Sequence, residues 1–81
     1  MLDLGDLATI IRLIEIELFQ LQKKIEGDDL EESDNAAEII VYTDNLAVKL
    51  KNMYEALWDQ NSGYPPYPAL VADYRKYPPF L

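Results

Sequence analysis

Carboxylates are the most numerous of the side chains that could take part in chemistry. The 81 residues include 15 aspartates and glutamates but neither histidine nor cysteine, so the commonest general base and the thiolate nucleophile are both missing. Ser33 is the single serine, and Thr9 and Thr43 are the threonines. A hydroxyl nucleophile needs a neighbouring base to activate it. We therefore expect a protein without enzymatic activity.

The carboxylates are also poorly spaced for acid–base or metal chemistry. Glu15 and Glu17 are two positions apart, so on a helix they do not face each other. A dimetal site in a helical bundle needs a Glu-x-x-His motif, and a calcium loop needs a regular Asp-x-Asp-x-Asp-Gly run. The sequence contains neither motif. We expect no catalytic residue, no metal and no cofactor.

An acidic segment, Gly-Asp-Asp-Leu-Glu-Glu-Ser-Asp at 27–34, contributes much of the net charge of −8. Our interpretation is a solvated bend whose side chains cap the following helix. The same charge suggests an alternative function, an inhibitor or immunity-type protein that occupies a basic, nucleic-acid-binding surface of a partner. The residues of that electrostatic contact would be Asp28, Asp29, Glu31, Glu32 and Asp34. Direct binding to nucleic acid is not expected, because a phosphate backbone attracts clustered lysine and arginine.

The elements that position these residues follow from the apolar spacing. Leucine and isoleucine recur alternately three and four positions apart in the first third of the chain, which predicts a helix over about 4–26 with one buried seam. The seam residues are Leu4, Leu7, Ile11, Ile14, Leu18, Leu21 and Ile25. Gly27 follows the last of them and is expected to end the helix in the left-handed conformation.

A second helix is predicted over about 34–60. Its start is expected between residues 29 and 36, where Asp29 and Asn35 both resemble capping residues. The predicted seam comprises Ala36, Ile39, Thr43, Leu46, Leu50, Met53 and Leu57. We expect Thr43 to bond to a carbonyl of its own helix. Because the connection at 27–34 is short, the two helices should form an antiparallel hairpin.

The tail, residues 61–81, has a different composition. Each proline in the Tyr-Pro-Pro-Tyr-Pro run at 64–68 restricts the residue before it to extended geometry. A short helix is predicted over about 69–76. We interpret the tail as a strap that packs its aromatic residues against Trp58 at the open end of the hairpin. The strap residues are Tyr64, Tyr67, Tyr74, Tyr77 and Phe80. Alternatively, the run from Pro65 to Pro68 is a polyproline ligand through which a small adaptor or chaperone subunit engages a larger assembly.

Both helices have apolar residues beside their seams, which indicates that each is buried on more than one side. In the first helix these are Leu13, Ile16 and Phe19, and in the second they are Ile40, Ala47, Tyr54 and Trp58. The tail could cover part of this surface, and a second hairpin could cover the rest. We therefore predict interface residues at these positions and a homo-oligomer, with a dimeric four-helix bundle favoured and a further protein partner possible in addition.

The sequence thus predicts a single all-α domain: an antiparallel two-helix hairpin with a Pro/Tyr-rich strap and a short third helix. Arg12, Glu15 and Glu17 interrupt the apolar run of the first helix, so no membrane span is expected. The start of the chain has no basic region typical of a secretion signal, and we expect a cytoplasmic protein. Its expected function is protein–protein interaction, with self-association through apolar helix faces.

Overall fold

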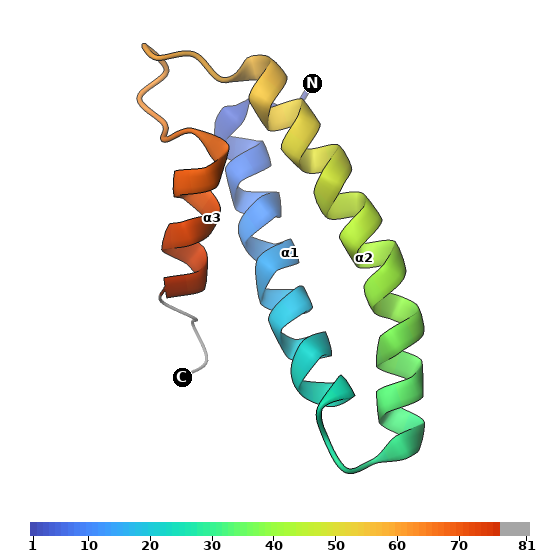
Figure 1. Ribbon diagram of the computed structural model, residues 1–81. Helices are drawn as coiled ribbons and strands as arrows, with labels where there is room; N and C mark the ends of the chain where they lie inside the picture. Colours follow the sequence, from blue (N-terminus) through green and yellow to red (C-terminus); the bar gives the residue numbers. More distant parts are fainter. Residues whose placement is uncertain (77–81) are drawn as a thin grey trace.

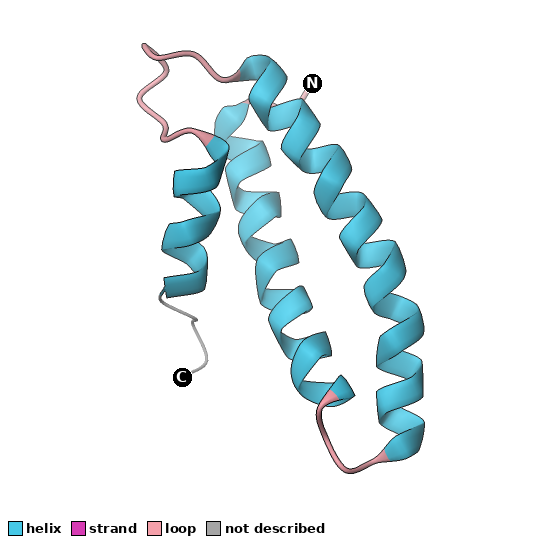
Figure 2. Cartoon of the chain, in the orientation of Figure 1, coloured by secondary structure: helices cyan, strands magenta, loops and turns pink. Residues whose placement is uncertain are grey.

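The computed structural model describes residues 1–76, which contain three α-helices and no strand. α1 spans Leu4–Ile25, α2 spans Leu30–Leu57 and α3 spans Tyr67–Lys76. α1 and α2 lie antiparallel, and α3 lies beside the first half of α1 (Figure 1). The segments that connect the helices are loops (Figure 2). The predicted all-helical class and the packing of two long helices are confirmed. Tyr77 and Phe80 of the predicted strap lie outside the described residues.

The two ends of the hairpin differ in whether α3 packs against them. The hairpin tip is the end where α1 connects to α2, and the open end is where α1 begins and α2 ends (Figure 1). α3 packs only at the open end. The two halves of the hairpin therefore have different amounts of covered surface.

Local hydrogen bonds set the start of α1. Asp3 and Asp6 form a reciprocal capping box, in which the backbone N–H of Asp6 donates to Asp3 Oδ1 at 2.8 Å and that of Asp3 donates to Asp6 Oδ2 at 3.1 Å. These bonds satisfy N–H groups that have no partner inside the helix. Lys23 and Lys24 occupy the last turn, where the helix dipole favours cations.

α2 begins at Leu30, within the predicted interval of 29–36 and at the earlier of its two capping candidates, so the bend is shorter than the segment 27–34. Asp29 is the N-cap residue, and its side chain accepts a hydrogen bond from the backbone N–H of Glu32 at 3.1 Å. The hydroxyl of Ser33 then donates to the backbone carbonyl of Ile25 at 3.0 Å. This bond satisfies a carbonyl at the end of α1 and joins the two helices across the tip.

The expected left-handed conformation of Gly27 was wrong. α1 ends at Glu26 in a right-handed conformation (φ −80°, ψ −8°), and the N–H groups of Glu26 and Gly27 donate to carbonyls of the last turn. Gly63, in the loop after α2, is the described glycine with a positive φ, 82°. Only glycine adopts this region at little cost, so the sharp reversal of the chain occurs there.

α2 ends at Leu57, before the predicted limit near residue 60. Trp58 is already extended (φ −68°, ψ 141°). Asp59 then competes with helix continuation: its carboxylate accepts a hydrogen bond from the N–H of Asn61 at 2.9 Å, and its carbonyl accepts one from Ser62 at 3.0 Å. Short polar side chains commonly replace helical bonds in this way.

The hydrophobic core lies at the open end, where all three helices meet. Its buried residues are Leu7, Ala8, Ile11, Leu50, Tyr54, Leu70 and Val71, with Leu4, Ile10, Ile14, Trp58, Tyr67 and Tyr74 packed around them. The seam predicted for α1 is buried or half-buried along its whole length. Toward the tip, where α3 is absent, Leu21 and Ala36 are the buried residues.

The seam predicted for α2 was wrong in register. Ile39, Leu46, Met53 and Leu57 are 44–49% exposed. The face that packs on α1 instead comprises Ala36, Ile40, Thr43, Ala47, Leu50, Tyr54 and Trp58. From Ala36 to Tyr54 this set is also spaced alternately by four and three positions, so it has the same heptad period, and Trp58 follows four positions later. Its larger side chains, Tyr54 and Trp58, are the ones that fill the core at the open end. Thr43 donates to the carbonyl of Ile39 at 3.1 Å, as predicted.

Burial of tyrosine side chains makes the free energy of unfolding depend on pH in the alkaline range. The pKa values of Tyr54, Tyr67 and Tyr74 are raised above the usual 10.0, and burial of the phenol is the largest cause for each. The unfolded chain therefore loses these protons at a lower pH than the folded chain does. The free energy of unfolding keeps the full contribution of the phenols below about pH 10 and loses it as pH rises through the raised pKa values.

The expected result is a melting temperature that falls progressively above about pH 10, measured by circular dichroism from pH 7 to 11.5. A Tyr74→Phe variant should lose about 1 kcal/mol at pH 7, because Tyr74 donates to the carbonyl of Ala8 at 3.2 Å. Its alkaline decline should be shallower than that of the unmodified chain. Parallel declines would contradict this assignment.

Candidate interaction surface

The tail holds two of the residues that the sequence suggested for a partner interface. The hydroxyl of Tyr54 donates to the carbonyl of Pro65 at 2.6 Å, and the indole N–H of Trp58 donates to the carbonyl of Tyr64 at 2.7 Å. The ring of Tyr67 meets that of Tyr54 edge-on, with centroids 6.3 Å apart. Tyr54 is completely buried. Its assignment to a partner interface was therefore wrong, because α1 and the tail already cover it. Ile40 and Ala47 are half-buried in the face toward α1.

α3 is fixed to α1 by polar contacts from two consecutive residues near its end. Tyr74 donates to the carbonyl of Ala8, and the guanidinium of Arg75 binds both carboxylate oxygens of Glu15, at 3.0 and 3.2 Å. The hydrogen bond that Arg75 donates to the Glu15 carboxylate raises the pKa of Arg75. The Arg75 side chain is 66% exposed, so the pair contributes less than about 1 kcal/mol. Its main effect is to orient the second half of α3.

A row of apolar side chains on α2 has no cover within the described residues. This row, called the outer stripe here, comprises Ile39, Tyr42, Leu46, Met53 and Leu57. Their exposed fractions range from 44% at Leu46 to 77% at Tyr42. Residues 39, 46 and 53 are separated by heptads, so they follow one line along the helix. Four of the five, all except Tyr42, belonged to a seam that the sequence placed inside the hairpin.

The outer stripe lies on the side of the hairpin away from α3. Lys51 reaches the ring of Tyr67, with its Nζ 5.8 Å from the centroid, which marks the flank of α2 that faces α3. At 100° per residue, the outer stripe falls on the opposite flank of the face that packs on α1. Val41 and Val48, which are 56% and 52% exposed, lie on the flank of α2 toward α3 and away from α1.

The off-seam residues of α1 do not share one environment. Leu13 is 53% exposed and lies on the flank of α1 that adjoins the outer stripe. Ile16 and Phe19 are half-buried, and the ammonium of Lys23 lies 4.9 Å from the centre of the Phe19 ring. Of the three predicted interface residues on this helix, Leu13 is thus the one on the same side as the outer stripe.

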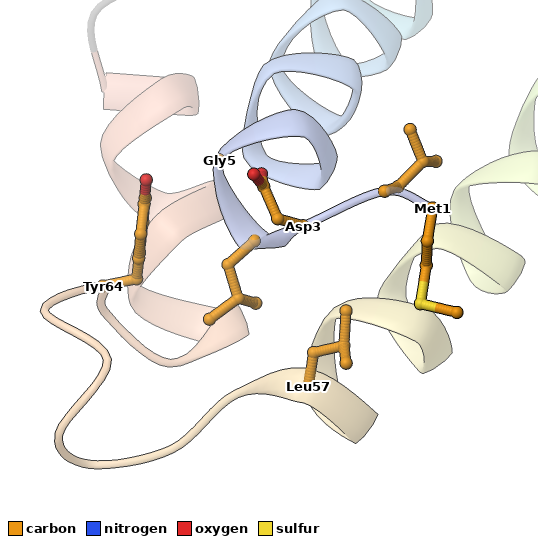
Figure 3. A pocket seen from close by; sticks show the side chains of 7 residues that line it. Met1, Asp3, Gly5, Leu57 and Tyr64 are labelled. Atoms are coloured by element: carbon orange, nitrogen blue, oxygen red, sulfur yellow. The ribbon is translucent and has the colours of Figure 1, made fainter.

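An open pocket of about 550 Å³ continues the apolar surface at the open end. Its lining residues are Met1, Leu2, Asp3, Leu4, Gly5, Leu57 and Tyr64, and Figure 3 shows Met1, Leu57 and Tyr64 around it. Gly5 permits the approach of the Tyr64 ring, because a Cβ at position 5 would lie 2.9 Å from the Tyr64 hydroxyl. Leu57 belongs to both the pocket and the outer stripe, so the two surfaces are continuous.

The acidic residues at the hairpin tip are all exposed, but they do not form a uniformly negative surface. Asp28, Asp29 and Glu32 line a small depression together with Lys23 and Lys24. Asp29 is also engaged as the N-cap residue of α2. Nearby lysines therefore offset part of this negative charge, and one of the carboxylates is already used to cap α2. Both facts weaken the alternative of an electrostatic contact with a basic partner.

Within residues 1–76, no group of three or more carboxylates is arranged to hold a metal ion. The same part of the chain has no helix with the length and apolar content to cross a membrane. No family model, curated protein sequence or solved structure matches this chain.

Proposed function

We propose that this protein is a non-enzymatic interaction module that associates with itself through the outer stripe of α2. The observation that supports the proposal most directly is the placement of Ile39, Leu46 and Met53 in one exposed heptad line. Single exposed apolar residues are normal on protein surfaces. A continuous row of them next to an exposed leucine of the neighbouring helix is typical of an interface.

The size of the surface suits a dimer of moderate affinity. From Ile39 to Leu57 the outer stripe extends over 18 residue rises, about 27 Å of helix, and a helix with its side chains is about 10 Å wide. Together with the adjoining edge of α1, which includes Leu13, this gives about 500 Å² per copy, or about 1,000 Å² in a symmetric dimer. This area is at the lower limit for specific association, so we expect a dissociation constant in the micromolar range.

A matched pair of variants tests the proposal. Leu46→Glu places a charge in the outer stripe, where the wild-type side chain is 44% exposed. Val48→Glu makes the same kind of change two positions away, at a side chain that is 52% exposed on the other flank. Neither position is buried in the single chain, so both variants should keep the helical fold. Light scattering across 1–100 µM is the measurement.

The unmodified chain should show a mass near two copies at the upper concentrations. Leu46→Glu should remain a monomer throughout, because a dimer would desolvate the new carboxylate. Val48→Glu should behave like the unmodified chain. A wild-type monomer at 100 µM would overturn the proposal, and equal dissociation of both variants would show that the interface lies elsewhere.

A further inference from the structure

One basic residue lies beside the outer stripe. Lys49 follows Tyr42 by seven positions and precedes Met53 by four, so its side chain leaves α2 next to the apolar residues. It is exposed and makes no ion pair within the described residues. Its aliphatic stem can pack in an apolar contact, but its ammonium requires an anionic partner to be buried there.

A suitable carboxylate lies on the border of the same stripe. Glu38 directly precedes Ile39, is exposed and makes no ion pair within the described residues. On the helical wheel it lies about 20° from Lys49. The two residues are 11 positions apart, or about 16 Å along the helix. This distance exceeds the Debye length of about 8 Å at physiological salt, so they do not stabilise each other within one chain.

We propose that the occupant of the outer stripe is the α2 helix of a second copy in antiparallel orientation, with Glu38 of each chain paired to Lys49 of the other. This inference rests on the proposed function. A two-fold axis beside Thr43 and Asp44 brings residue 38 of one copy level with residue 49 of the other. The same axis places Tyr42 level with residue 45 of the second copy, one position from Leu46. Charge pairing therefore selects a register in which the segments from Ile39 to Leu46 of the two copies meet, whereas Met53 and Leu57 lie level with residues 34 and 30 of the second copy.

The alternative parallel, in-register dimer would place like charges together. Lys49 would then face Lys49 of the second copy beside the apolar stripe, and Glu38 would face Glu38. Like charges in this position destabilise a helix pair and are a common device for excluding one orientation. The antiparallel arrangement converts both repulsions into attractions.

Charge reversal at the two positions tests the orientation. The variants are Glu38→Lys, Lys49→Glu and the double variant that carries both changes, compared with the unmodified chain. In the antiparallel dimer each single change produces two repulsive pairs, and we expect the dissociation constant to rise about tenfold or more. The double variant restores two attractive pairs with reversed sign. Its dissociation constant should return to within about threefold of the wild-type value.

Sedimentation equilibrium at low and at 1 M salt gives the readout, and circular dichroism verifies that each variant keeps its helices. The differences between variants should nearly vanish at 1 M salt, where the Debye length is about 3 Å. Because residues 38 and 49 do not interact within one chain, rescue can only arise between chains. Equal association of all four proteins, or failure of the double variant to recover, would overturn the antiparallel pairing while leaving self-association intact. A monomeric wild-type chain would overturn both.

Discussion

Removing residues 61–81 is expected to abolish the cooperative unfolding of this protein. The tail supplies Leu70 and Val71, which are 6% and 7% exposed in the core, and its loss uncovers Leu7 and Tyr54. Burial of two aliphatic side chains contributes about 3–6 kcal/mol, a large fraction of the 5–15 kcal/mol that stabilises an ordinary domain. Thermal melting followed by circular dichroism should show a broad, sloping loss of helix instead of a sigmoidal transition.

Single substitutions in α3 separate the effect of the core from that of chain length. Leu70→Asp should reproduce the truncation, because it buries an unpaired carboxylate. Ala72→Asp changes an exposed position of the same helix and should keep a cooperative transition. If the truncated chain melts as sharply as the complete one, then the tail is a ligand for a partner rather than a part of the core.

Leu50→Ala is expected to lower the free energy of unfolding by about 2–5 kcal/mol, the usual range for truncating a buried leucine. Leu50 is 5% exposed and packs in the core at the open end. Leu30→Ala, in the first turn of the same helix, serves as the matched control, because Leu30 is 79% exposed. Its expected effect is within about 0.5 kcal/mol.

Urea denaturation at a fixed, low protein concentration measures both values without a contribution from self-association. The comparison also tests the register of α2, because Leu50 belongs to the face that packs on α1. A cost for Leu30→Ala as large as that for Leu50→Ala would mean that the described core is incomplete. A Leu50→Ala effect below 1 kcal/mol would place the packing face of α2 elsewhere.

The structure agrees with sequence reasoning most closely where one pattern excluded all others. On α1 the residues from Leu4 to Ile25 form a single heptad series, and they are buried or half-buried as expected. On α2 two heptad series share Ala36, Thr43 and Leu50, and periodicity alone cannot choose between them. The choice depends on which series offers side chains large enough to fill the open end beside α3. Tyr54 and Trp58 do so, and the series with Leu46 and Met53 is left on the surface.

The tail shows why the candidate site was only partly predictable. Its composition indicated a strap, but the contacts that hold it are hydrogen bonds from Tyr54 and Trp58 to backbone carbonyls of the loop. Every residue has a backbone carbonyl, so the sequence does not show which of them will accept a hydrogen bond from a side chain. The aromatic residues that looked like a partner interface were therefore the ones that the chain covers itself, and the apolar residues assigned to the inside became the exposed stripe.

The hydrogen bond from Tyr74 to Ala8 joins positions 66 apart, which has a consequence for synthesis of the chain. At about 5–20 residues per second, the ribosome adds Tyr74 about 1–3 seconds after α2 is complete. Because Leu70 and Val71 are missing from the core until then, α1 and α2 are not yet held in a cooperative fold. For that interval the nascent chain displays two uncovered apolar sides, one that its own tail will soon close and one that stays open.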